Sequence, residues 1–252
     1  TGSETVANIT FDTTSPVFTI NTPSNSASVN TSNLSYDLSK TIASGTVTYT
    51  RTGGTAADNV TYNLSGTELN IGTSKNLLTF PTLVNGAIYT IVISGTDAAG
   101  NTGNATVTGI TFTSTPPEFT GITPPTGSSV NSTNVSYTLN ESITSGSVTF
   151  TRTHGPEDNS PHVVTLGALN GGFHKYLPNR PTLVNGATYT ISFSGTDAAG
   201  NTSAPTSVTG ITFDNSNPAF TNITPISDTS VNTSNVIYTL SENIVSGYVA
   251  YY

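Results

Sequence analysis

The stretch Ser94-Gly-Thr-Asp-Ala-Ala-Gly-Asn101 occurs twice in this chain, and its second copy, Ser194–Asn201, is identical. Another stretch, Pro81-Thr-Leu-Val-Asn-Gly86, returns unchanged at Pro181–Gly186. The copies lie about 100 residues apart, which is too long for the repeats of a solenoid or propeller at roughly 20–50 residues. The spacing matches one small domain. The chain is therefore predicted to be an array of sandwich-sized modules.

The composition excludes several classes of function. The 252 residues include no Cys, so disulfides cannot stabilise the chain. The net charge is −8 with only six Lys and Arg, which leaves no basic stripe for nucleic acid. No apolar run approaches the roughly 20 residues of a membrane span. The chain begins at Thr1 without a signal peptide, so export has to be inferred from other features.

Short segments of alternating apolar and polar residues, separated by Gly, Pro, Asn and Asp, fill each repeat and are typical of an all-β sandwich. One segment shows the pattern best, because Thr46, Thr48 and Thr50 alternate with Val47 and Tyr49. No helical periodicity is present. In the first repeat we expect seven strands, A to G, at 17–20, 34–38, 45–51, 60–64, 77–80, 89–94 and 107–112.

Alignment of the copies sets the expected boundaries. These are the last strand of a preceding repeat at 1–11, a first repeat at 12–112, a second at 113–213, and a partial third with strands A to C at 214–252. Neither end completes a sandwich, so both would expose unpaired strand edges. Either the chain is a window from a longer array, or a neighbouring chain supplies the missing strands. The first eleven residues offer one strand only, so we favour the window.

A tyrosine follows the repeated Asn-Gly pair at the same distance in both copies. Tyr89 comes three residues after Gly86, and Tyr189 three residues after Gly186. This spacing predicts a tyrosine corner, in which the hydroxyl bonds back to the backbone of the turn before strand F. A simple inward-facing core aromatic is the alternative.

Taken in order, the motifs are Asp12-Thr-Thr-Ser-Pro16, then Tyr-x-Leu before a short loop, then Asn85-Gly-Ala-x-Tyr-Thr-Ile91, then Thr96-Asp-Ala-Ala-Gly-Asn101. This frame resembles bacterial immunoglobulin-like repeats, the tandem modules of large surface adhesins, biofilm proteins and S-layer-type proteins. The resemblance covers essentially the whole chain. It implies tandem Ig-like β-sandwich domains of about seven strands each, arranged end to end, with an extracellular and non-enzymatic role.

Immunoglobulin topology brings the start of strand A, the B–C loop and the F–G loop to one pole of each domain. Ca²⁺ takes six to eight oxygen ligands, and carboxylates that converge at a pole suit it. The resemblance implies Ca²⁺ at such junctions, so Ca²⁺ is the one candidate cofactor. The carboxylates expected at the poles are Asp12, Asp97, Glu118, Glu141, Asp197, Asp214 and Glu242.

Turn formation explains the repeated Asp without a metal. Asp97 and Asn101 flank Ala-Ala-Gly, and a tight turn favours Asp at its start and Gly at its left-handed position. Lys40 also stands where the later repeats carry Glu141 and Glu242. We favour turn formation over Ca²⁺ binding.

The sequence offers no set of residues for catalysis. His154, His162 and His174 occur only in the second repeat, with no shared strand face that would favour zinc. They are expected to be solvated loop residues. No Ser/His/Asp set lies in a strand–turn–helix context, so we predict no catalytic residue and no enzyme.

These features predict an extracellular or cell-surface structural repeat protein, as a stalk, filament or surface-layer component that provides reach and rigidity. Its partners would be neighbouring copies of the array or cell-surface components, rather than nucleic acid or a membrane. The first alternative is an adhesin module that binds a glycan or surface ligand through pole loops, since 155–161 and 170–174 diverge most. The second alternative is a filament subunit assembled by strand complementation between chains.

Overall fold

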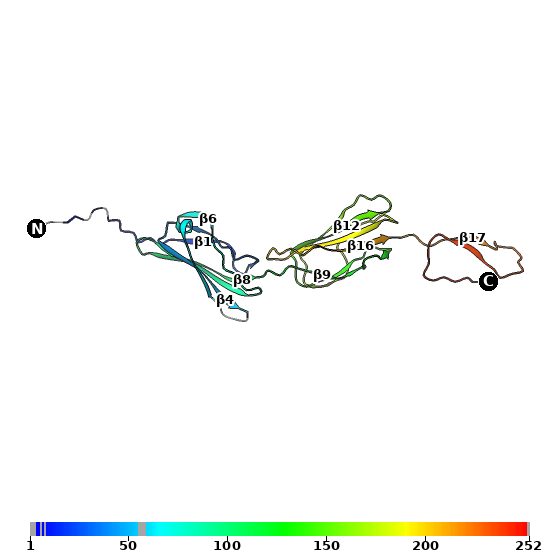
Figure 1. The fold of residues 1–252 in the computed structure, drawn as a ribbon, viewed down its shortest axis with the longest axis horizontal. Coiled ribbons are helices and arrows are strands. Elements are labelled where there is room, and N and C mark those ends of the chain that lie inside the picture. Colours follow the sequence, from blue (N-terminus) through cyan, green and yellow to red (C-terminus); the bar gives the residue numbers. More distant parts are fainter. Residues whose placement is uncertain (1–3, 6, 8, 55–58, 251–252) are drawn as a thin grey trace.

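The structure is a computed structural model that describes residues 4, 5, 7, 9–54 and 59–250. Within these residues the chain is all-β, apart from the short 3-10 helix η1 (Gly66–Leu69). Two sandwiches and a smaller pair of strands follow one another along the long axis of the molecule (Figure 1). The predicted fold class, a tandem array of immunoglobulin-like β-sandwiches, is confirmed.

The first sandwich packs a three-stranded sheet, in the order β1-β3-β6, against a five-stranded sheet, in the order β2-β8-β7-β4-β5. All of its pairs are antiparallel except β2 with β8, which is parallel. Its strands are β1 (Phe18–Thr22), β2 (Ser28–Val29), β3 (Ser35–Leu38), β4 (Ser44–Gly53), β5 (Asn59–Asn63), β6 (Gly72–Asn76), β7 (Ile88–Thr96) and β8 (Thr102–Phe112).

The second sandwich repeats this topology with the sheets β9-β11-β14 and β10-β16-β15-β12-β13. After it, β17 pairs with β18 in the antiparallel arrangement that β1 and β3 have in the first sandwich. These strands are β9 (Phe119–Thr123), β10 (Ser129–Val130), β11 (Ser136–Leu139), β12 (Ser145–His154), β13 (His162–Leu166), β14 (Gly172–His174), β15 (Thr188–Thr196), β16 (Thr206–Phe213), β17 (Phe220–Thr224) and β18 (Ile237–Leu240).

Each sandwich buries a core of its own. Val47 and Tyr49 of β4 face inward and are fully buried, whereas Thr46, Thr48 and Thr50, which alternate with them, face outward. The first core runs from Phe18 to Ile110 and the second from Phe119 to Phe213. Among the described residues the two cores have no member in common. Each sandwich is therefore built to fold around a separate interior.

The tyrosine corner is present in both sandwiches. The Tyr89 hydroxyl accepts a hydrogen bond of 3.0 Å from the backbone N–H of Val84. The Tyr189 hydroxyl accepts the equivalent bond of 2.9 Å from Val184. Both rings are buried, so the predicted corner is confirmed and also forms part of the core.

The prediction of a strand at 77–80 is wrong. The structure places the corresponding strand upstream, as β6, and leaves 77–80 outside any strand. Polar β6 lies at the edge of its sheet and is mostly exposed, so it lacks the apolar alternation that marks a strand. Leu77 is buried without being in a strand, which explains the misleading apolar signal.

Two further details differ from the sequence-based expectation. The strand predicted as D, now β5, pairs with β4 in the five-stranded sheet and so occupies the C′ position. Strands that follow each other in the sequence commonly pair as a hairpin, as β4 and β5 do here. The two-residue strand β2 was not predicted, because so short a segment carries no periodic signal.

The described residues of the two segments predicted to end the array do not form the expected strands. Of the segment 1–11, the described residues 4, 5, 7 and 9–11 lie in no strand, and residues 1–3, 6 and 8 fall outside the described part. In the predicted strand C of the third repeat, residues 246–250 lie in no strand, and 251–252 are not described. The repeat boundaries stay a prediction.

Candidate functional site at the module junctions

The repeated Asp-Ala-Ala-Gly-Asn segment forms a tight turn between β7 and β8. The Oδ1 atom of Asp97 accepts hydrogen bonds of 2.9 Å from the backbone N–H groups of Ala99 and Asn101. Gly100 has a φ of 92°, a left-handed conformation that favours glycine. The copy at 197–201 makes the same bonds. The turn prediction for these residues is confirmed.

This turn positions an asparagine amide against the segment that leads into the same sandwich. Asn101 Nδ2 donates to the carbonyl oxygen of Asp12 at 3.0 Å, and Asn201 Nδ2 donates to that of Thr113, also at 3.0 Å. The aspartate of each turn accepts a further bond from the same amide, which fixes its orientation. The entering chain is thereby attached to the turn.

A second repeated asparagine attaches the segment that leaves each sandwich. Asn85 Oδ1 accepts a 2.7 Å bond from the backbone N–H of Ser114, and Asn85 Nδ2 donates to the Thr115 hydroxyl at 2.8 Å. Asn185 makes the equivalent two bonds, both 2.8 Å, to residues 215–216. The two motifs that recur unchanged therefore each supply one asparagine to a junction.

Both attachments meet on the segment 113–117, which we call the junction. The backbone N–H of Thr113 donates to the carbonyl of Val29 in the first sandwich at 2.9 Å. Its carbonyl accepts from Asn201 in the second sandwich. No spacer residue separates these bonds, and Pro116 and Pro117 restrict φ immediately afterwards. Rotation of one sandwich about the junction would break at least one of the bonds.

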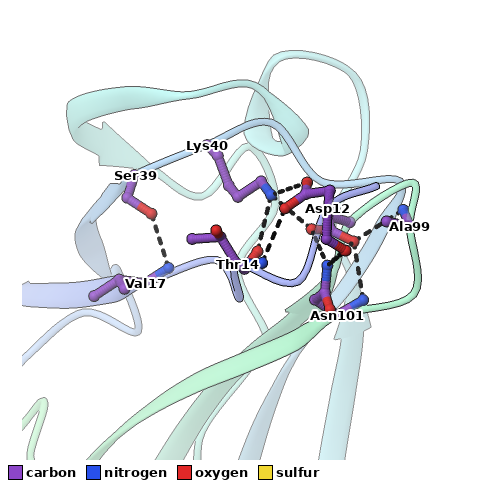
Figure 2. A network of polar contacts seen from close by, with 8 residues as sticks. Asp12, Thr14, Val17, Ser39, Lys40, Ala99 and Asn101 are labelled. Atoms are coloured by element: carbon purple, nitrogen blue, oxygen red, sulfur yellow. Dashed lines mark hydrogen bonds and ion pairs between the residues drawn. The ribbon is translucent and has the colours of Figure 1, made fainter. Parts of the chain in front are cut away.

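The leading pole of the first sandwich contains an ammonium group between two carboxylates. Lys40 Nζ lies 2.6 Å from Asp12 Oδ2 and 2.7 Å from Asp97 Oδ2, and it also donates to the carbonyl of Thr14 at 2.9 Å. Figure 2 shows Lys40 reaching to Asp12 and Thr14 above Asn101. The Asp97 side chain is 2% exposed. This ion pair ties the entering segment to two loops of the sandwich.

The electrostatics of this pole follow from those contacts. The hydrogen bond from Lys40 lowers the pKa of Asp12 below its ordinary value. The same ammonium, followed by Asn101, holds the pKa of Asp97 well below its usual range. Hydrogen bonds to Asp12 and then Asp97 raise the pKa of Lys40. All three groups are charged at neutral pH.

The later poles differ because a glutamate replaces the lysine. Burial, and then the charge of Asp197, raise the pKa of Glu141. Burial, and then Asp214, raise the pKa of Glu242 in the same way. The Oε1 atoms of Glu141 and Glu242 are buried and have no hydrogen-bond partner among the described residues. Glu118 lines a hollow with Pro117 and Thr206, and its backbone N–H donates to Asn140 Oδ1 at 2.7 Å.

The residues of the first pole do not fit Ca²⁺, because Lys40 already bonds to Asp12 and Asp97. At the second pole Glu141 lies close to Asp197, and neither forms an ion pair with another described residue. Within the described part of the chain, no group of three or more His, Cys, Asp and Glu is arranged to hold a metal ion. Ca²⁺ at the second pole, and at the third pole with Asp214 and Glu242, stays a prediction.

The first pole predicts a pH-dependent contribution to stability. Because folding lowers the pKa of Asp12 and Asp97, their contribution is complete above the unfolded value near 3.8 and is lost as pH falls through the folded values. We expect Lys40→Met to reduce the protection of β4 and β7 amides from hydrogen exchange at neutral pH. The difference from wild type should shrink below about pH 4. A difference of constant size down to acid unfolding would contradict this assignment.

Sequence reasoning missed the role of the asparagines and the role of Glu68. Glu68 is 1% exposed and accepts hydrogen bonds from the N–H groups of Ser65 and Leu78. The histidines are not brought together, and the prediction that they lie in loops is wrong: His154, His162 and His174 lie in β12, β13 and β14. His162 bonds to Asp158, and His174 stacks on Tyr137 in the core. The unchanged recurrence of the asparagines was the one signal available for their role.

The similarity of the chain to known proteins agrees with this architecture. A family model described as bacterial Ig-like domain (group 3) matches residues 1–123. No curated protein matches the chain.

Several solved structures are similar to the chain at low identity. The tetra-tandem repeat in the extending region of a large adhesion protein is 21% identical, with 90% of this chain and 62% of that chain covered and a TM-score of 0.33. A structure of a 1.5-MDa bacterial ice-binding adhesin is 18% identical, with 85% and 71% covered and a TM-score of 0.27. The chicken CNTN1 FN1–FN3 domains are 11% identical, with 77% and 66% covered and a TM-score of 0.39.

The chain spans less than two thirds of the length of the first of these structures and of the chicken structure. The family match covers the segment before the first sandwich, that sandwich, the junction and the first strand of the second sandwich, β9. Residues 1–123 thus match the model of a bacterial Ig-like domain of group 3, in agreement with the resemblance recognised in the repeats.

Proposed function

We propose that the chain is a section of an extracellular structural array whose Ig-like modules provide reach and rigidity at a cell surface. The observation that supports this most directly is the junction, where Thr113 is bonded to Val29 of the first sandwich and to Asn201 of the second. Modules joined without a free spacer transmit orientation from one to the next. Such a junction suits a stalk, a filament or a surface layer.

The proposed role is mechanical and non-catalytic. The outer face of β4 carries Thr46, Thr48 and Thr50, and that of β12 carries Ser147, Thr149 and Thr151. These uncharged hydroxyl groups form hydrogen bonds with water and keep the surface hydrated. Contacts between neighbouring arrays would then depend on hydrogen bonds and strand edges rather than on salt bridges. Among the described residues, no helix has both the length and the apolar character needed to cross a membrane.

Small-angle scattering on the full chain tests the mechanical role. We expect the profile of an elongated particle in which the two sandwiches keep one relative orientation. A profile that fits only a broad mixture of bent forms would contradict the proposal.

Antibody labelling of intact bacteria that produce the protein tests its location, and labelling seen only after lysis would exclude a cell-surface role.

Ca²⁺ at the second pole is a separate proposal. A chelator is expected to lower the hydrogen-exchange protection of β12 and β15, because Glu141 and Asp197 would lose their counter-ion. Protection of β4 and β7 should not change, because Lys40 supplies the positive charge of the first pole. Unchanged protection in both sandwiches would exclude a structural Ca²⁺ ion.

A further inference from the structure

Three Asn-Gly pairs occur in the chain, at Asn85, Asn170 and Asn185. In such a pair the backbone nitrogen of the glycine can attack Cγ of the asparagine side chain, because glycine has no Cβ to obstruct the approach. The bond from this nitrogen to Cγ forms, the bond from Cγ to Nδ2 breaks, and ammonia leaves with the glycine proton. Water then opens the succinimide ring to aspartate or isoaspartate.

At Asn85, the groups that would react are bonded to the segment that leaves the first sandwich. The Gly86 N–H, whose nitrogen would attack, donates to the carbonyl of Phe112 at 2.8 Å. Asn85 Oδ1 accepts from the Ser114 N–H at 2.7 Å, and Asn85 Nδ2, the leaving group, donates to the Thr115 hydroxyl at 2.8 Å. Asn85 is exposed, so these bonds restrain it rather than burial.

The second sandwich repeats this arrangement at Asn185. The Gly186 N–H donates to the carbonyl of Phe213 at 2.8 Å. Asn185 Oδ1 accepts from the Asn215 N–H, and Asn185 Nδ2 donates to the Ser216 hydroxyl, both at 2.8 Å. In both copies the attacking nitrogen and the side chain that it attacks are held by the same leaving segment. The reaction therefore requires that segment to detach.

The third pair provides a reference within the same chain. Asn170 is exposed and lies in the loop before β14. Its carbonyl accepts from His174, but its side chain has no hydrogen bond to another described residue. The Gly171 N–H donates to the Ser142 hydroxyl at 3.3 Å, a longer bond than those at Gly86 and Gly186. No leaving segment has to detach before Asn170 reacts.

We propose that Asn85 and Asn185 are sites of spontaneous deamidation and that the bonded leaving segment suppresses the reaction. Its rate follows the fraction of molecules in which that segment is detached. In isoaspartate the main chain runs through the former side chain and is one methylene longer, so the former bonds to the leaving segment cannot all re-form. A junction that opens often is thereby loosened irreversibly. This inference needs the bonded junction but not the proposed cellular location.

Peptide mass spectrometry of the full chain, incubated at mildly alkaline pH, measures all three sites in one sample. The rate at each site in the folded chain is compared with its own rate in denaturant, where the three pairs are equally unrestrained. We expect folding to slow Asn85 and Asn185 by at least about tenfold, and to slow Asn170 less. Rates at Asn85 and Asn185 that folding leaves unchanged would overturn the proposal.

Two matched variants assign the suppression to the leaving segments. Thr115→Val removes the partner of Asn85 Nδ2 and is expected to speed deamidation of Asn85 about fivefold without changing Asn185. Ser216→Ala removes the partner of Asn185 Nδ2 and should speed that site alone. Unchanged hydrogen-exchange protection of β4 and β12 amides shows that both sandwiches stay folded. The proposal also fails if each variant leaves its own site unchanged, or if both variants speed both sites equally.

Hydrogen exchange at the first junction tests the effect of the product. In chains that carry isoaspartate at position 85, the Ser114 N–H should lose protection, because its acceptor has moved. Chains deamidated only at Asn170 are the control and should keep this protection. If the Ser114 N–H stays protected in the isoaspartate form, the reaction does not loosen the junction and the proposed consequence is wrong.

Discussion

Glu68→Ala is expected to destabilise the first sandwich by about 3 kcal/mol and to leave the second unchanged. The Glu68 carboxylate accepts bonds of 2.8 Å from the N–H of Ser65, 2.6 Å from the N–H of Leu78 and 3.0 Å from the hydroxyl of Tyr62. Removing it leaves two backbone donors without this acceptor at a buried site. Leu78 follows the edge strand β6, so its bond also holds the end of that strand against η1.

Hydrogen exchange measures this effect separately in each sandwich, because amides in β4 and β7 report on the first and those in β12 and β15 on the second. Glu68→Gln keeps an acceptor and should lose less than Glu68→Ala. The aligned residue of the second sandwich is Ala168, which shows that the fold tolerates the small side chain where the acceptor is not required. A loss below about 1 kcal/mol for Glu68→Ala would show that these bonds contribute little.

Gly146→Ala should destabilise the second sandwich by about 3 kcal/mol, chiefly through a backbone clash. Gly146 of β12 pairs with Gly195 of β15, so the two strands approach without side chains at that point. A Cβ atom at Gly146 would lie 2.5 Å from the carbonyl oxygen of Ser194, which cannot move without disturbing the β12–β15 pairing. It would also lie 3.1 Å from Ile143.

Chemical denaturation, followed by circular dichroism, measures the loss for Gly146→Ala. Ser145→Ala serves as the control, because Ser145 is the exposed neighbour in the same strand and should change stability by less than about 0.5 kcal/mol. Equal stability of the two variants would mean that the strands can separate slightly at little cost, against the close pairing described here.

The sequence predicts the fold well wherever a strand is half-buried. In β4, β7, β12 and β15 the alternation of inward apolar and outward hydroxyl residues is regular, and the tyrosine corner has a fixed spacing. The prediction fails at the polar edge strand β6, whose side chains are mostly exposed. Buried Leu77 gave the stronger but misleading signal.

The candidate site was only partly predictable. The turn of Asp97 and Asn101 is local, so its residue types indicate it directly. The bond from Asn201 to Thr113 joins residues 88 positions apart, and no local pattern reveals such a partner. Lys40 was recognised as a departure from the acidic pattern, but its position between Asp12 and Asp97 depends on three separate loops.

The distance between the two sandwiches is the most direct test of the proposed junction. Because the chain has no Cys, spin labels can be placed at Thr61→Cys in β5 and Thr165→Cys in β13, both exposed. Pulsed electron resonance should give a narrow distance distribution for the otherwise unaltered chain. The combined Asn85→Ala and Asn201→Ala changes should broaden it, whereas Asn104→Ala on the exposed face of β8 should not. A broad distribution in the unaltered chain, or one that the combined changes leave narrow, would contradict a junction held by these asparagines.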